Sequence, residues 1–285
     1  MKRRGESAKR IRLTVQILFF VVVASTTVVH ALEEMGISVP VLAGASLHAI
    51  CPFGGVVTLY RLITEGAYVQ KIHESAVWLL GIVMISTVLI GPAFCGWVCP
   101  FGSFQEWIGT IGKRLFKRRY NRFVPPRLDR VLRYLRYVVL IWVVVMTATT
   151  ATLIFSAYDP YYALFNFYTG EVAVTGYVSL GLVMVLSLFV ERPFCKYACP
   201  YGALLGTVNL FRIFRLRRNA STCIDCKACD TSCPMNILVS TVAVVRDHQC
   251  NVCLKCTSEQ SCPIPHTVEL NSTRLEDVAT REARQ

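Results

Sequence analysis

The residues of this 285-residue chain that are best suited to chemistry are its 13 cysteines. Eight of them lie near the C-terminus in two runs. Each run has three cysteines separated by two residues and a fourth cysteine directly before a proline. The first run is Cys223, Cys226, Cys229 and Cys233, and the second is Cys250, Cys253, Cys256 and Cys262. The first spacing is that of the ligands in bacterial-type [4Fe–4S] ferredoxins, so the runs predict two such clusters.

In two-cluster ferredoxins the fourth cysteine of each run ligates the cluster of the other run. We therefore predict two ligand sets that cross between the runs. The first set is Cys223, Cys226, Cys229 and Cys262, and the second set is Cys250, Cys253, Cys256 and Cys233. The second run has five residues before its last cysteine instead of three, which we expect to reshape a loop without abolishing binding. Zinc is the alternative, but two tandem triplets that each lead to Cys-Pro disfavour it.

Four more cysteines belong to a duplicated motif. Residues 94–102 read FCGWVCPFG and residues 194–202 read FCKYACPYG, an offset of 100. Cysteines four apart share a helical face, so each copy is predicted to point two sulfurs the same way. Facing copies would then supply four ligands for a further iron–sulfur cluster or metal, namely Cys95, Cys99, Cys195 and Cys199. Buried structural thiols and a redox-active dithiol are the alternatives.

The elements that position these cysteines are predicted to be membrane helices. The chain is 54% hydrophobic and 17% charged, whereas soluble domains carry about 25% charged residues. Four uncharged runs reach the roughly 20 residues that cross a hydrocarbon core as a helix. The predicted spans are about 13–32, 75–95, 137–157 and 172–192. The expected fold is membrane α-helical, with two tandem helical-hairpin repeats followed by an α+β two-cluster ferredoxin domain.

The charge distribution orients this arrangement. The chain has 30 Lys and Arg against 18 Asp and Glu, a net charge of +12. Twenty-two basic residues fall in the N-terminal arm, the connection between the second and third spans, and the segment after the fourth span. The positive-inside rule then places both termini and the ferredoxin domain on the cytoplasmic side of a prokaryotic inner membrane. Because membrane orientation accounts for this distribution of Lys and Arg, the net positive charge does not predict a nucleic-acid partner. A reducing cytoplasm also disfavours disulfides.

These observations divide the chain into four predicted segments. They are a basic arm at 1–12, a membrane domain at 13–215, a ferredoxin domain at 216–266 and a polar tail at 267–285.

The predicted outer side carries weaker candidates. Cys51-Pro52-Phe53 precedes the second span as Asp159-Pro160-Tyr161 precedes the fourth, a faint second element of the repeat. Cys51 and the nearby His48 could line a quinol pocket or bind a cofactor, although an unliganded thiol is the simpler interpretation. The groups that could accept protons from a quinol there, or be solvated loop residues, are His48, His73, Asp159 and Glu171.

Repeated Cys-x3-Cys-Pro motifs on membrane helices, followed by a two-cluster ferredoxin domain, resemble the NapH/NosR-type membrane iron–sulfur proteins. The similarity extends from Cys51 to Pro263. It implies a quinol-dehydrogenase-type electron-transfer subunit, with both ferredoxin clusters on the cytoplasmic side. The chain lacks the outer-facing flavin-binding domain of the NosR type, so a flavin would belong to another subunit.

The leading expectation is therefore an electron conduit. It would link the cytoplasmic ferredoxin clusters, the membrane cysteine site, and quinol or another redox partner such as a flavoprotein or a terminal reductase. The alternative is an accessory or maturation protein that reduces a metal such as copper for a respiratory enzyme. A redox sensor is disfavoured because about 20 polar residues follow Cys262, too few for an output domain.

Overall fold

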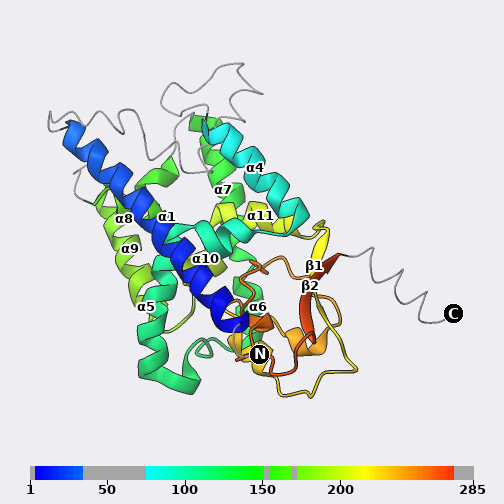
Figure 1. The fold of residues 1–285 in the computed structure, drawn as a ribbon. Helices are drawn as coiled ribbons and strands as arrows, with labels where there is room; N and C mark the ends of the chain where they lie inside the picture. The colour runs from blue at the N-terminus through cyan, green and yellow to red at the C-terminus, as the bar shows by residue number, and fades with distance from the viewer. Residues whose placement is uncertain (1–3, 35–74, 151–153, 168–171, 273–285) are drawn as a thin grey trace. The chain divides into compact units, whose positions relative to one another are not determined.

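The computed structural model describes residues 4–34, 75–150, 154–167 and 172–272 (Figure 1). The α-helices are α1 (Arg4–Glu34), α4 (Ser75–Leu89), α5 (Pro100–Phe116), α6 (Pro126–Leu132), α7 (Leu135–Thr150), α8 (Pro160–Phe165), α9 (Val174–Ser187), α10 (Pro193–Tyr197), α11 (Pro200–Asn209) and α12 (Ala228–Ser232). The strands are β1 (Phe214–Arg218) and β2 (Val268–Ser272), and short helical turns cover Phe94–Val98, Lys117–Arg119, Ile154–Ala157, Val239–Thr241 and Lys255–Thr257.

The chain forms two compact units, which we consider separately. Unit 1 contains residues 1–15, 84–98 and 204–285, and unit 2 contains residues 16–83 and 99–203. The eight C-terminal cysteines and Cys95 belong to unit 1, whereas Cys99, Cys195 and Cys199 belong to unit 2.

A helix lies at each of the four predicted spans; α1 is longer than its predicted span, whereas α4 and α9 are shorter. Among the described residues, only α1 is long and apolar enough to cross a membrane, over Lys9–Val29. The apolar helices α4 and α9 end at Leu89 and Ser187 instead of continuing to 95 and 192. The four-span arrangement therefore stays a prediction.

A proline follows each early helix end, three residues after Leu89 and six residues after Ser187. Proline disfavours the α conformation in the residue before it and has no N–H to continue the helix. Gly91 precedes Pro92 and has φ +110°, and Arg192 precedes Pro193 and has φ +54°. Each break comes just before one copy of the Cys-x3-Cys-Pro motif, so the repeat seen in the sequence is also a repeat of backbone structure.

Glycines let α5 and α9 approach closely within unit 2. A Cβ atom on Gly112 would lie less than 3.0 Å from the backbone carbonyl oxygen of Leu188, closer than real Cβ contacts. The Tyr120 hydroxyl donates to the carbonyl oxygen of Ser187 at 3.2 Å beside this crossing.

Aromatic packing ties part of α1 into unit 2. The ring of Phe20 lies 5.1 Å from that of Trp107 and 5.7 Å from that of Phe165. Val23 and Phe165 are buried beside it. These contacts join α1, α5 and α8 through large apolar side chains, the usual source of packing energy.

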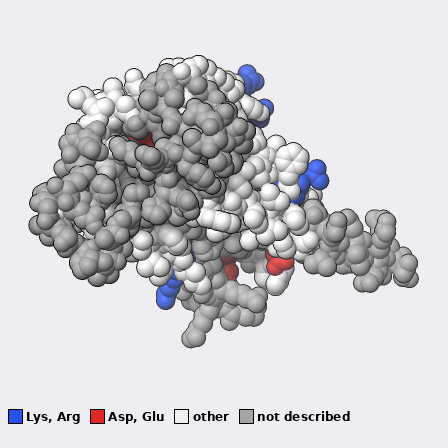
Figure 2. All heavy atoms as spheres, turned by 90° about the horizontal axis from the view of Figure 1, so that it is seen from above, with Lys and Arg blue, Asp and Glu red and all other residues white. Residues whose placement is uncertain are grey.

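The apolar helices also leave large side chains exposed. Trp78 on α4 is 75% exposed and Val174 on α9 is 77% exposed, and Ile141 on α7 is also exposed. Figure 2 shows a face on which the described surface is mostly uncharged, with Lys and Arg only at separate points. Apolar surface of this extent is typical of a membrane or protein interface.

Strands β1 and β2 close the cysteine-rich part of unit 1. They pair antiparallel, with the buried Leu216 opposite Leu270 (Figure 1). The segment between them contains all eight C-terminal cysteines. Pairing of the two strands thus brings the ends of this segment together, as an α+β ferredoxin domain requires.

Candidate metal centres

One cavity of unit 1 is lined by four cysteines from both runs. They are Cys233, Cys250, Cys253 and Cys256, the members of the predicted second set. The remaining walls are largely apolar and include Leu216, Val245 and Val252. Apolar side chains around four sulfurs exclude water, as an iron–sulfur cluster site requires.

A second cavity holds the other four cysteines. Cys223, Cys226, Cys229 and Cys262 all line it, so the structure brings them together as the crosswise prediction groups them. The longer loop before Cys262 folds into a turn, in which the Ser261 N–H donates to the carbonyl oxygen of Ser258 at 2.9 Å. The extra residues are therefore accommodated locally, and Cys262 still reaches the cavity.

The sulfurs of the second set lie close enough to influence each other electrostatically. Burial raises the pKa of Cys256, and the thiols of Cys253, Cys233 and Cys250 raise it further. Burial also raises the pKa of Cys229, in the first set, to about 11. Thiolates at these positions need a positively charged partner, which iron ions supply.

The geometry fits clusters better than single ions. Among the described residues, no three His, Cys, Asp or Glu side chains converge closely enough to hold one metal ion. Tetrahedral zinc would need sulfurs about 2.3 Å from one centre. A cubane cluster instead places its four thiolates around a larger body, so two four-cysteine cavities match two [4Fe–4S] clusters.

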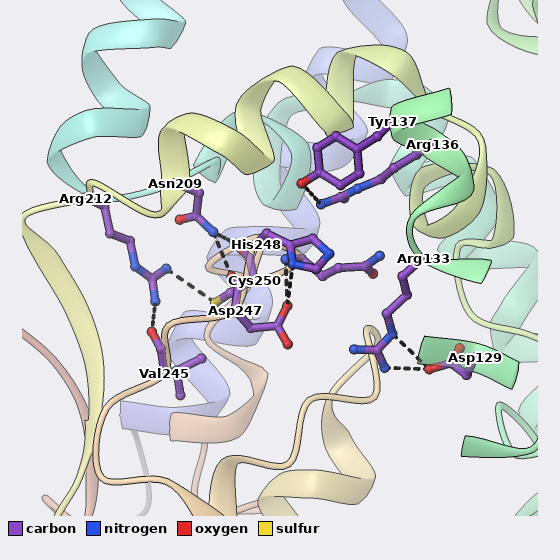
Figure 3. A network of polar contacts seen from close by, with 11 residues as sticks. Asp129, Arg133, Arg136, Tyr137, Asn209, Arg212, Val245, Asp247, His248 and Cys250 are labelled. Atoms are coloured by element: carbon purple, nitrogen blue, oxygen red, sulfur yellow. Dashed lines mark hydrogen bonds and ion pairs between the residues drawn. The ribbon is translucent and has the colours of Figure 1, made fainter. Parts of the chain in front are cut away.

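Polar side chains outside the cysteine runs hold the second-set loop. The Asn209 side-chain amide donates to the carbonyl oxygens of Asp247 and Cys250 at 3.0 and 3.1 Å. Arg212 donates to the carbonyl oxygen of Val245 at 2.8 Å and to the Cys250 sulfur at 3.4 Å (Figure 3). Asn209 is the last residue of α11 and Arg212 lies in the segment that joins α11 to β1, and sequence reasoning assigned neither of them to a cluster site.

The first motif copy also lies against this loop. The Trp97 indole N–H donates to the carbonyl oxygen of Val252 at 3.0 Å. A Cβ atom on Gly96 would lie less than 3.0 Å from the carbonyl oxygen of Asn251, so only glycine permits this approach. The turn that carries Cys95 is thus built to contact the backbone between two second-set cysteines.

We expect Gly96→Ala to separate the motif turn from the second-set loop. The added methyl would meet backbone, which cannot rotate away, and overpacking of this kind costs about 1–3 kcal/mol. Thermal unfolding of the purified protein should show the loss. Gly181→Ala is the matched control: a Cβ at Gly181 meets nothing within 4 Å, and Ala is the better helix former by about 1 kcal/mol. Equal stability of the two variants would contradict the contact.

Three of the four motif cysteines lie in unit 2. Burial and the neighbouring Cys99 thiol together raise the pKa of Cys195 to about 11. The buried Gln105 amide donates to the Cys195 sulfur at 3.4 Å, and the Gly202 N–H donates to the Cys199 sulfur at 3.3 Å. Cys95 belongs to unit 1, so a four-thiolate site stays a prediction.

The prediction that paired motif cysteines share one helical face is wrong. Cys95 lies in the turn Phe94–Val98, whereas Cys99 precedes α5 with an extended ψ of 113°. Cys195 lies in α10, which ends before Cys199. Pro100 and Pro200 start new helices and force the break.

Two basic residues near the second motif copy are buried in ion pairs. Arg192 and Lys196 are both 0% exposed. Arg192 binds Glu106 with an N–O distance of 2.6 Å, and Lys196 binds Asp129 at 2.6 Å. Each therefore neutralises a buried carboxylate, a role that the charge distribution of the sequence did not predict, and the membrane orientation stays a prediction.

Asp159 caps a short buried helix. Its carboxylate accepts from the Tyr161 N–H at 3.0 Å, and the Tyr161 ring lies 6.3 Å from that of Phe101. The segment predicted as an outer loop therefore lies beside the start of α5, near Cys99. The other outer-side candidates, Cys51, His48, His73 and Glu171, lie outside the described residues.

Comparison with known proteins supports the repeat and the chemistry. The model of a 4Fe-4S binding domain family matches residues 73–119 and 172–219, one match for each motif copy. YccM of Escherichia coli, named for electron transport, is 33% identical over 76% of this chain; the match covers 61% of YccM, so the chain spans less than two thirds of that relative. An uncharacterized protein of Methanocaldococcus jannaschii is 32% identical over 73% of this chain and 82% of its own length. The ferredoxin-type protein NapH of Haemophilus influenzae is 25% identical over 61% of this chain and 59% of NapH. No solved structure matches.

Proposed function

Because the chain belongs to the NapH/NosR-type family of iron–sulfur electron-transport proteins, we propose that it is a membrane-bound electron carrier. In this proposal the ferredoxin domain holds two [4Fe–4S] clusters, and the duplicated motif holds a further cluster or metal. Electrons pass between them and a quinol or another redox subunit. The ferredoxin domain faces the cytoplasm, and the chain crosses the inner membrane several times.

One observation carries the proposal: eight cysteines line two neighbouring cavities as crosswise sets of four. Protein side chains alone do not hold single electrons, whereas iron–sulfur clusters supply that chemistry when bound. The cysteines hold the clusters, and the apolar walls exclude water.

The contact of the motif turn with the second-set loop supports a link between the two kinds of site. Gly96 and Trp97 directly follow Cys95 in the motif, and both contact the segment 251–253. Electron exchange requires redox centres to be close and held rigidly. The close backbone contact between Gly96 and Asn251, which leaves no room for a side chain, fixes the motif turn against the second-set loop.

The membrane motif is tested with Cys95→Ser and Cys199→Ser. We expect each variant to lose iron and acid-labile sulfide relative to the unmodified protein, while the signals of the two ferredoxin clusters remain as internal controls. Reduction by quinol should be lost because the site between quinol and the clusters is missing. Unchanged metal content together with unchanged quinol reduction would disprove the membrane site.

A further inference from the structure

The Arg212 side chain has an unusual position for a cation near the predicted membrane surface. It is only 2% exposed, and its Nη1 atom lies 3.1 Å from the place where a Cβ of Gly91 would be. Its Nη2 atom donates to the carbonyl oxygen of Val245, which fixes the plane of the guanidinium (Figure 3). Its Nη1 atom also donates to the Cys250 sulfur at 3.4 Å.

A guanidinium in this position acts on the sulfur in two ways. It is always charged, so it brings a full positive charge to a site of several thiolates. It also donates an N–H to one of the ligands. Net charge and hydrogen bonds to the sulfurs are two main determinants of cluster potential, and both act strongly here because Cys250 and Cys256 are buried.

Arg218 and Lys227 also line the cavity of the first set, but the side chains that contact its sulfurs are carboxylates. The Asp225 carboxylate lies 3.9 Å from the Cys223 sulfur, and the Asp230 carboxylate lies 3.8 Å from the Cys229 sulfur. Negative charge disfavours a further electron at this cluster. The second set is more buried than the first. Burial alone would also make its cluster harder to reduce, because reduction adds negative charge. The positive charge of Arg212 opposes that effect.

We propose that Arg212 raises the reduction potential of the cluster held by the second set and so makes the two ferredoxin clusters electronically unequal. The proposal rests on the proposed function, since it requires clusters in both cavities. Arg212 is a potential-setting residue and not a ligand. By holding the potential up, it makes the cluster beside the Cys95 turn easier to reduce than its burial would allow.

The test is a redox titration of the anaerobically purified full-length protein, followed by electron paramagnetic resonance (EPR). Arg212→Gln removes the charge, and we expect the midpoint potential of one cluster to fall while the other stays constant. Arg212→Lys keeps the charge with fewer donors and should give a smaller fall in the same cluster. If the Gln variant does not assemble its cluster, the Lys variant alone tests the proposal.

Arg215→Gln is the matched control. Arg215 lies in β1, three residues after Arg212, and its guanidinium donates to the carbonyl oxygens of Arg212 and Leu210 and not to a cysteine sulfur. The control should shift neither potential. Unchanged potentials in both Arg212 variants, or equal shifts of both clusters, would overturn the proposal. Absence of cluster signals from the unmodified protein would instead overturn the proposed function itself.

Discussion

Replacing Cys256 with Ser is expected to remove one of the two ferredoxin clusters. Cys256 is 6% exposed and lies among three other thiols, so water cannot take its place easily. A serine hydroxyl does not ionise readily in such a site. Iron in the ferredoxin domain should fall from about eight to about four atoms per chain, with loss of one EPR signal.

The same experiment tests the crosswise sets. Cys233→Ser should remove the signal that Cys256→Ser removes, although Cys233 belongs to the first run of the sequence. Cys262→Ser should remove the other signal and leave that one intact. If Cys233→Ser instead behaved like Cys262→Ser, the cysteines would be grouped by run and the two cavities would be assigned wrongly.

The second large effect is expected from Asp129→Asn. Asp129 binds Lys196 at 2.6 Å and Arg133 at 2.5 Å, and it accepts from the Tyr197 hydroxyl at 2.6 Å. The substitution leaves the fully buried Lys196 without its counter-ion, which typically costs about 3–5 kcal/mol. Because Lys196 follows Cys195 directly, the second motif copy should loosen as the protein loses stability. Thermal unfolding in detergent measures the loss, with the exposed Glu259→Gln as control.

The Asp129 interaction also predicts a pH dependence. Burial alone would raise the pKa of Asp129, but hydrogen bonds from Lys196, Tyr197 and Arg133 hold it below its ordinary value, which is about 3.9. A lowered pKa stabilises the folded state above the ordinary value, and this stabilisation is lost as the pH falls toward the folded pKa. The stability difference between the unmodified protein and Asp129→Asn should therefore shrink below about pH 4. A difference that stayed constant there would contradict the ionised carboxylate.

The cysteine chemistry could be predicted from the sequence because ligand spacing is a local property. Three cysteines separated by two residues must lie close together in any compact fold, and Cys233 and Cys262 follow at short range. The internal repeat could also be predicted, since the Cys-x3-Cys-Pro motif occurs twice in the sequence, 100 residues apart. The helix ends at Leu89 and Ser187 were signalled by Pro92 and Pro193, but hydrophobicity alone extended the helices past them.

The contacts that position the cysteines depend on residues far apart in the chain. Asp129 and Lys196 are 67 positions apart, and Arg212 and Cys250 are 38 apart. No local pattern pairs them, so the basic residues were interpreted as orienting charges. One signal was available: the third position of the duplicated motif is Gly96 in one copy and Lys196 in the other. Among the four positions at which the copies differ, this exchange of Gly for Lys changes both size and charge, which indicates different neighbours for the two copies.

The central claim is that this chain holds cysteine-ligated iron–sulfur clusters that exchange electrons with the membrane quinone pool. EPR spectroscopy of the anaerobically purified full-length protein, reduced separately with quinol and with dithionite, tests it most directly. Dithionite should develop the signals of two [4Fe–4S] clusters, and quinol should change the oxidation state of at least one centre. A protein that contains zinc in place of iron and gives no signal with either reductant would contradict the account.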